Sequence, residues 1–365
     1  MAATATQVPT CLSPPQPTSC GVKLLAESSS TTIPSNFTFT NDPTASIADS
    51  LPTIDFSLLT SANPDQRSKA IHLLAKACEE WGFFVLVNHG IPKTLLKAII
   101  DASSEYFELP EEERRRYEPK SPSDPIKAGT GRLIDTENQR VHLWRDYIKC
   151  YVHPEFHCPH KPLMLRDILF EFCERTRLLA RKLIHVIGEK LELEQEYVDE
   201  ALDLDSTFQL FAANMYPLCP QPDQAIGIPP HTDPGLFTFL IHNGVDGLQI
   251  EHDGKWFNAD SPNDSILVNV ADHLQIFSNG RYKSVKHRAV VNNERERVSV
   301  VVSNGPSGET VVGPAAPLVM KDGRSLYQPM KYTDYMDSLL TKCRLNGGTI
   351  LEQLMIKEDN SADYY

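Results

Sequence analysis

The stretch Pro229-Pro230-His231-Thr232-Asp233 decides how this chain is interpreted, because it places an imidazole and a carboxylate two residues apart. A residue before proline favours extended backbone, and side chains two apart on a strand point to the same side. A second imidazole, His287, lies in a segment whose alternate residues are apolar, which is typical of a strand with an inward face. Two imidazoles and one carboxylate form a ligand set for non-haem Fe(II) that leaves coordination positions open. We therefore predict a metal site at His231, Asp233 and His287.

A His-X-Asp triplet alone is weak evidence in a chain with 12 histidines, so a second group of residues matters. Arg297 and Ser299 alternate with valines, which predicts a strand with the arginine and the serine on one face. A planar guanidinium beside a hydroxyl suits a clamp for a carboxylate. Asn214 and Tyr216 add an amide and a phenol with the same two-residue spacing. The alternative is an exposed strand whose arginine pairs with one of two preceding glutamates.

Composition limits the class of protein. The net charge of −13 argues against nucleic-acid or acidic-membrane partners, which are bound by clusters of Lys and Arg. The eight cysteines are scattered without a Cys-X-X-Cys pair, which favours free thiols in a reducing compartment. No apolar run reaches the length of a membrane-spanning helix. We expect a cytoplasmic monomer that binds a small molecule.

Residues 1–50 are rich in Ala, Ser, Thr and Pro, and we predict a disordered tail there. The alternative is a plastid transit peptide, although the absence of arginine weighs against it.

The remaining chain divides where the hydrophobic period changes. Residues 51–206 show two strong helical patterns, Pro64 to Trp81 and Leu163 to Leu191, and a polar, loop-rich segment from Leu109 to Pro162. We interpret this part as an N-terminal mixed helical region that supports the core. From residue 207 to 331 short strands alternate with turns, which indicates a β-sandwich or barrel that carries the site. Residues 332–365 form a predicted C-terminal helix and tail. The predicted fold class is mainly β with flanking helices, with a double-stranded β-helix (jelly-roll) core.

Together the motifs His231-X-Asp233, His287, Arg297-X-Ser299 and Asn214-X-Tyr216-Pro217 resemble the plant 2-oxoglutarate and Fe(II)-dependent dioxygenases. The resemblance runs from about Leu51 to about Met336. It includes Leu51-Pro52-Thr53-Ile54-Asp55, Trp81-Gly82-Phe83-Phe84, Asn88-His89-Gly90 and Ser278-Asn279-Gly280-Arg281-Tyr282. The runs Ala225 to Asp233 and Val290 to Asn293 resemble the subgroup of downy-mildew-resistance-type salicylate hydroxylases and some flavonoid oxidases.

The resemblance implies roles for these residues. Fe(II) would be held by His231, Asp233 and His287, and O2 and 2-oxoglutarate would be cosubstrates, with ascorbate as the reductant. The far carboxylate of 2-oxoglutarate would be held by Arg297 and Ser299, with Tyr216 as a further donor and Asn214 near the metal. Succinate and CO2 would be released.

The same resemblance implies oxidation of a small plant specialised metabolite such as a phenolic, flavonoid or alkaloid, by hydroxylation, desaturation, ring closure or demethylation. Ser303 stands where many flavonoid-processing members carry a stacking phenylalanine, and Trp144-Arg145-Asp146-Tyr147 resembles a segment near the substrate entrance. Pocket-lining candidates are Leu133, Leu210, Ala212, Phe237 and Ser303. Two alternatives stay open: a related Fe(II)/ascorbate oxidase that does not use 2-oxoglutarate, and a non-catalytic binding protein on the same fold.

Overall fold

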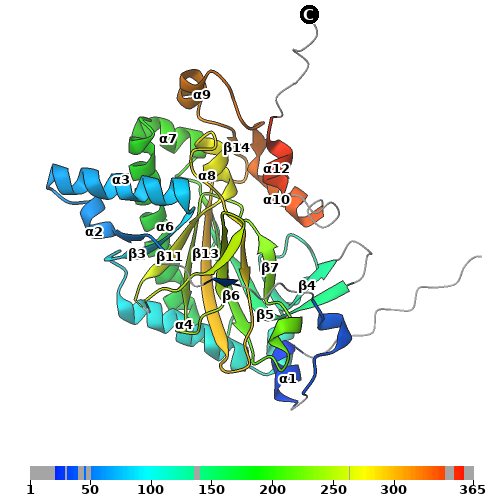
Figure 1. Ribbon diagram of the computed structural model, residues 1–365. Coiled ribbons are helices and arrows are strands. Elements are labelled where there is room, and N and C mark those ends of the chain that lie inside the picture. Colours follow the sequence, from blue (N-terminus) through cyan, green and yellow to red (C-terminus); the bar gives the residue numbers. More distant parts are fainter. Residues whose placement is uncertain are drawn as a thin grey trace, which may run out of the picture.

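Two β-sheets face each other, and helices cover the outer side of the larger sheet (Figure 1). The computed structural model describes residues 21–28, 31–39, 45–46, 51–134, 140–262, 264–341 and 349–356. The predicted fold class, a jelly-roll core with flanking helices, is confirmed.

The larger sheet has eight strands and the smaller has five. In spatial order the larger contains β2 (Thr53–Asp55), β3 (Phe83–Val87), β11 (Ile266–Val270), β8 (Phe237–His242), β13 (Arg297–Gly305), β6 (Phe208–Tyr216), β5 (Arg140–His153) and β4 (Ile126–Ile134). The smaller contains β1 (Ala45–Ser46), β10 (Lys255–Asn258), β9 (Leu248–His252), β12 (His287–Ala289) and β7 (Ile228–His231). A separate pair joins β14 (Val311–Val312) and β15 (Met330–Lys331).

Helices precede, follow and interrupt these strands. They are α1 (Val22–Glu27), η1 (Ser35–Phe37), α2 (Phe56–Leu59), α3 (Pro64–Glu80), α4 (Lys93–Glu108), α5 (Glu111–Arg115), α6 (Leu165–Lys190), α7 (Gln195–Leu202), η2 (Pro222–Gln224), α8 (Asp272–Phe277), α9 (Ala316–Asp322), α10 (Tyr332–Thr341) and α12 (Ile350–Leu354). Among the described residues, no helix is long and apolar enough to cross a membrane.

Local chemistry explains the two long predicted helices. The side chain of Asn63 accepts hydrogen bonds from the backbone of Asp65 and Gln66, and Pro64 occupies the first turn of α3, so the helix begins there. Along α6 the apolar residues recur at three- and four-residue steps and are buried, as for Leu169 and Leu183. Both helices contribute buried residues to the large apolar core.

The segment predicted as loop-rich contains two long strands instead. Strands β4 and β5 extend the larger sheet beyond β6, so this sheet crosses the boundary predicted at residue 206. The expected alternation of apolar and polar residues is obscured on β5, because its inward side carries Arg145, Tyr147 and Lys149.

Part of the predicted disordered tail is also ordered against β5. The Asp146 carboxylate accepts hydrogen bonds from the backbone N–H groups of Val22 (3.0 Å) and Lys23 (3.3 Å) at the start of α1. Phe37 packs its ring 5.5 Å from the ring of Trp144. The prediction was therefore wrong for residues 21–28 and 31–39, because contacts far along the chain stabilise a segment too short to fold alone. Residues 1–20 lie outside the described residues.

Candidate functional site

Two strands of the smaller sheet bring the predicted metal ligands together. His231 ends β7 and His287 begins β12, and the two residues are directly paired in the antiparallel register. The Nε2 atoms of both imidazoles lie 3.6 Å from Oδ1 of Asp233. Across the described residues, this is the one group of three or more His, Cys, Asp or Glu side chains whose ligand atoms converge, all within 4.8 Å of one another.

Neighbouring groups fix the orientation of these side chains. The Nδ1 atoms of His231 and His287 lie 2.9 and 3.3 Å from backbone carbonyl oxygens two residues earlier, which leaves each Nε2 directed at the centre. The Asn269 amide donates to Oδ2 of Asp233 at 3.0 Å. Behind the loop, the Asp272 carboxylate accepts from Thr232 (3.1 Å), so α8 braces the turn between the first two ligands.

The protonation states suit a divalent metal. Burial, and then the nearby His287 ring, lower the pKa of His231 to about 4, so its imidazole is neutral near pH 7. Burial alone would raise the pKa of Asp233, but the imidazoles of His287 and His231 hold that pKa below its ordinary value. A neutral imidazole and an ionised carboxylate are the forms that bind a metal, so the residues present fit Fe(II).

The predicted carboxylate clamp lies on the inner face of the larger sheet. Strand register pairs Arg297 with Tyr216 and Ser299 with Asn214, so the four side chains share one side. Arg297 is 2% exposed, and its guanidinium lies 5.1 Å from the centre of the Tyr216 ring. No described carboxylate forms an ion pair with it. The alternative of an exposed strand arginine is therefore wrong, and a buried cation is available for an anionic ligand.

Glycines allow the backbone to approach this clamp. A Cβ atom on Gly227 would lie 2.6 Å from ring atoms of Tyr216, and one on Gly247 would lie 3.0 Å from Cδ of Arg297. Gly247 also has a φ of +146°, which favours glycine. The close fit fixes where the phenol and the guanidinium lie.

Three of the five pocket candidates lie on the inner face. Ser303 pairs with Leu210, and Ala212 lies two residues further along β6 on the same side. The Ser303 hydroxyl donates to the Pro234 carbonyl at 3.3 Å, beside the metal-ligand loop.

The prediction that Phe237 lines the pocket is wrong. This residue lies on the outer face of β8, fully buried under the helices, with its ring 6.3 Å from that of Phe84. Its neighbour Thr238, which pairs with Ser303 across the sheet, faces the site instead. The side chain of the fifth candidate, Leu133, lies outside the described residues.

Sequence reasoning placed Arg145 and Tyr147 near the substrate entrance only by resemblance, and it missed Lys149. Tyr147 pairs with Asn214 and Lys149 with Ala212, so both face the same side as the clamp. Arg145 donates from Nη1 to Oδ1 of Asn214 at 3.2 Å. The two-residue spacing of Arg145, Tyr147 and Lys149 was the available signal, but it becomes meaningful only once β5 is known to be a strand.

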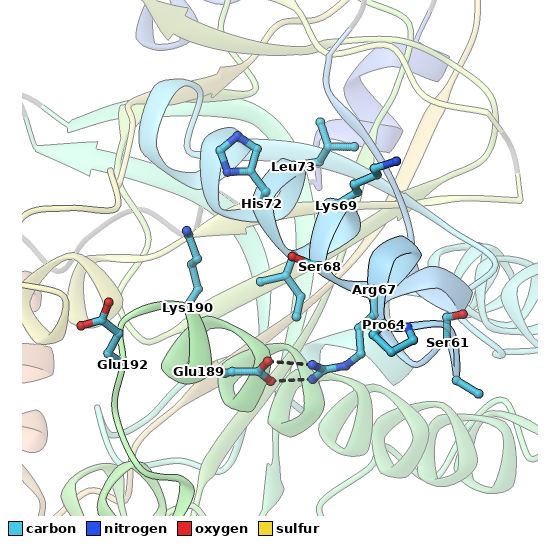
Figure 2. Close-up of a pocket in the computed structure, with 12 residues that line it drawn as sticks. Ser61, Pro64, Arg67, Ser68, Lys69, His72, Leu73, Glu189, Lys190 and Glu192 are labelled. Carbon is cyan, nitrogen blue, oxygen red and sulfur yellow. Dashed lines mark hydrogen bonds and ion pairs between the residues drawn. The ribbon is translucent and has the colours of Figure 1, made fainter.

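A wide surface cleft lies elsewhere, between α3 and the end of α6 (Figure 2). It has a volume of about 1060 Å³ and is spanned by hydrogen bonds of 2.6 and 2.5 Å from the Arg67 guanidinium to the Glu189 carboxylate. Figure 2 shows His72 alone among its lining residues as a possible imidazole ligand, with no second imidazole beside it. None of the three converging residues His231, Asp233 and His287 lines this cleft.

Known families match this chain over both of its main regions. The model of the 2OG-Fe(II) oxygenase superfamily matches residues 207–306, and that of the N-terminal region of the non-haem dioxygenase in morphine synthesis matches residues 51–168.

Several curated proteins are similar along most of their length. The chain is 46% identical to "2-oxoglutarate-dependent dioxygenase 19" of Oryza sativa subsp. japonica, over 81% of this chain and 88% of the relative. It is 34% identical to "Protein DMR6-LIKE OXYGENASE 1" of Arabidopsis thaliana, over 88% and 93% of the two chains. Among solved structures, JOX2 in complex with 2OG, Fe and JA superposes with a TM-score of 0.81 at 29% identity, covering 93% of this chain and 98% of JOX2.

Proposed function

The chain belongs to the 2OG-Fe(II) oxygenase superfamily and is a 2-oxoglutarate-dependent dioxygenase, and from this premise we propose that it oxidises a small plant specialised metabolite between its two sheets. Relatives that support this substrate class include flavanone 3-dioxygenase 2 of Oryza sativa subsp. japonica and flavonol synthase 1 of Crocosmia x crocosmiiflora.

The proposed metal ligands are His231, Asp233 and His287. When bound there, Fe(II) supplies the oxidising chemistry that consumes O2 and 2-oxoglutarate and releases succinate and CO2. The chain's own residues orient and hold the reactants. Backbone carbonyls keep the two imidazoles turned toward the centre, and Asn269 and the α8 brace keep the carboxylate in place.

The proposed cosubstrate site is the clamp on β6 and β13. Arg297 is buried without a carboxylate partner in the described part of the chain, so the far carboxylate of 2-oxoglutarate would complete a charge-assisted pair. Ser299 and Tyr216 lie beside the guanidinium and would donate further hydrogen bonds. Asn214 pairs with Ser299, which lies between Arg297 and Ser303 on β13. Its amide would orient the keto-acid end of 2-oxoglutarate.

The convergence of the two imidazoles on Asp233 carries this proposal. It is tested by succinate release from the Fe(II)-loaded protein, supplied with 2-oxoglutarate, ascorbate and a panel of plant phenolics and flavonoids. A matched pair of variants separates the site from an accidental pair: His231→Gln and His252→Gln. His252 also lies 3.6 Å from an aspartate, Asp253, but has no second imidazole beside it among the described residues.

We expect His231→Gln to lose substrate-dependent succinate release and His252→Gln to retain it. Equal activity of both variants would overturn the proposed metal site. Product formation that continues when 2-oxoglutarate is left out would overturn its role as cosubstrate.

A further inference from the structure

Strand β5 carries two cations toward the proposed active site. Lys149 pairs directly with Ala212 of β6, and Arg145 lies four residues earlier on the same strand. Residues that pair directly in an antiparallel sheet point to the same side, and so do residues two or four apart on a strand. Both side chains therefore share the inner face with the carboxylate clamp, and both are half-buried.

Within the described residues, no carboxylate forms an ion pair with Arg145 or Lys149. The Lys149 ammonium has no hydrogen-bond partner there and lies 5.8 Å from the centre of the Tyr147 ring. Nη1 of Arg145 donates a hydrogen bond to Asn214. Its Nε is buried and has no hydrogen-bond partner among the described residues. A buried donor without a partner, such as Nε of Arg145, is costly unless a ligand satisfies it.

A neighbouring lysine on the next strand shows the contrast. Lys127 of β4 pairs in register with Lys149, but its ammonium donates to the Pro122 carbonyl at 2.5 Å and to the Tyr151 hydroxyl at 3.1 Å. Among the described residues, the ammonium of Lys127 is therefore satisfied, whereas that of Lys149 has no hydrogen-bond partner.

The electrostatics place both cations around the metal site. Burial, and then the Arg145 charge, lower the pKa of Lys149 to about 8, whereas the Asp233 carboxylate opposes that change. Arg145 also contributes to lowering the pKa of His231. Lys149 remains mostly protonated near pH 7, so the pocket holds two positive charges beside the metal ligands.

Lys149 is separate from the Arg297 end of the 2-oxoglutarate clamp, whereas Arg145 contacts the clamp through Asn214. Arg297 is on β13 and the two cations are on β5, with β6 between them. Two strand spacings correspond to about 10 Å, which is enough for two different anions. Val301 and Ala212 continue the row from Lys149 across the sheet, so the anion would adjoin an apolar surface.

We propose that Arg145 and Lys149 bind a carboxylate of the substrate, so that the enzyme oxidises a small carboxylic acid and not a neutral polyphenol or a cationic alkaloid. This inference rests on the proposed function and narrows its substrate class. Arg145 and Lys149 are then specificity-determining residues that position the apolar part of the acid beside the metal ligands.

The test is calorimetric binding to the Fe(II)-loaded full chain without oxygen, at saturating 2-oxoglutarate. The probes are benzoate, 4-coumarate and 1-naphthaleneacetate, each compared with its methyl ester, and tyramine as a cation. We expect at least one acid to bind about tenfold to a hundredfold more tightly than its ester, as for a hydrogen bond to a charged group, and tyramine to bind least.

Three methionine variants locate the preference. Lys149→Met and Arg145→Met should each reduce the acid-to-ester ratio about tenfold or more, and Arg145→Lys should recover part of it. Lys127→Met is the matched control, because its ammonium is already held by the protein, and its ratio should stay within about twofold of wild type. Thermal unfolding of each variant confirms that it is folded.

Three results would overturn the inference: equal binding of all acids and esters, unchanged ratios in Lys149→Met and Arg145→Met, or acids that displace 2-oxoglutarate and therefore occupy the Arg297 site. A prior titration with 2-oxoglutarate alone separates the two proposals. If 2-oxoglutarate binds and no acid is preferred, only the inference fails. If 2-oxoglutarate does not bind, the proposed function fails and takes the inference with it.

Discussion

The two faces of the eight-stranded sheet are built from the same strands and differ in chemistry. On β6 and β13, Asn214, Arg297 and Ser299 face the space between the sheets, while Met215 and Val298 face the helices. The outer face is mainly apolar, and its buried polar residues Gln209 and Asn304 hydrogen-bond to each other. The inner face holds buried polar groups such as Arg297, which has no carboxylate partner among the described residues. We therefore expect that removing a side chain from the outer face lowers the stability of the fold. Removing one from the inner face should weaken ligand binding and turnover.

The sharpest way to break this comparison is to remove a metal ligand. His231→Ala, Asp233→Ala and His287→Ala should each abolish turnover, because three ligands are needed to hold Fe(II) and leave positions open. The fold should be retained, because the ligands lie at strand ends outside the large apolar core. Succinate release at saturating Fe(II), with circular dichroism as the control for folding, checks both statements. Full activity in a variant would remove that residue from the site.

The next test is on the outer face. Phe237→Ala should lower the free energy of unfolding by about 3–5 kcal/mol, because it opens a cavity in a fully buried site. Turnover per folded molecule and the ranking of substrates should match wild type. Denaturant unfolding and a substrate panel measure the two effects. A small loss of stability with a changed ranking would mean that Phe237 lines the pocket after all.

Arg297→Lys tests the inner face at the clamp. Lysine keeps the charge but lacks the planar fork, so the apparent affinity for 2-oxoglutarate should fall about tenfold to a hundredfold, or roughly 1.5–3 kcal/mol. Arg295→Lys is the matched control, because Arg295 is exposed and its guanidinium donates to the Gly244 carbonyl at 3.4 Å, on the surface. Saturation curves for 2-oxoglutarate that coincide for both variants would contradict the clamp.

Lowering the pH tests how stability depends on His273, a buried histidine next to the candidate site. Burial lowers the pKa of His273 to about 3, and the backbone of Gly235 donates to its Nδ1 at 3.2 Å. The unfolded chain takes up a proton on this histidine near pH 6.5, whereas the folded chain does so only near pH 3. The histidine's contribution to the free energy of unfolding is therefore present above pH 6.5 and is lost as the pH falls from 6.5 toward 3.

The slope should approach about 1.4 kcal/mol of unfolding free energy per pH unit within that window. His273→Asn keeps an acceptor for Gly235 and should flatten the dependence, whereas the exposed His72→Asn should leave it unchanged. Urea unfolding between pH 4 and pH 7 measures both, and parallel curves for His273→Asn and wild type would contradict the assignment.

The smallest expected effect is at Ser303. Its half-buried hydroxyl faces the site beside Pro234, so Ser303→Phe should change which substrates are accepted and favour flat aromatic molecules. A substrate panel at equal folded concentration compares the two proteins. An identical ranking with altered stability alone would show that the strand has left the pocket by this residue.

Strand periodicity made the central residues predictable. Because side chains two apart on a strand face the same side, the spacing alone places Arg297 with Ser299 on β13. His231 and Asp233 also converge as predicted, but Asp233 lies in the turn that follows β7, so strand alternation is not the reason. The long helices were equally accessible, since three- and four-residue spacing and the Asn63-Pro64 start are local properties.

Phe237 shows where the pattern fails. Strand β8 is almost entirely buried, with Phe237 and Phe239 on one side and Thr238 on the other, so composition does not reveal which side faces the site. The ordered segment at residues 21–28 was missed for a related reason, since its helix depends on Asp146, more than a hundred positions away.

The sequence by itself predicted the proposed metal ligands, the proposed clamp and the class of fold, through spacing within short segments and the family resemblance that these segments carry. Only the tertiary structure decided that β5 joins the larger sheet and turns Arg145 and Lys149 into the pocket. The physical reason is that the groups around a charged side chain decide whether it is already hydrogen-bonded within the protein or can bind a ligand. Lys127 and Lys149 pair directly in register, so strand register does not separate them. The Pro122 carbonyl and the Tyr151 hydroxyl hold the Lys127 ammonium, whereas the Lys149 ammonium has no hydrogen-bond partner among the described residues.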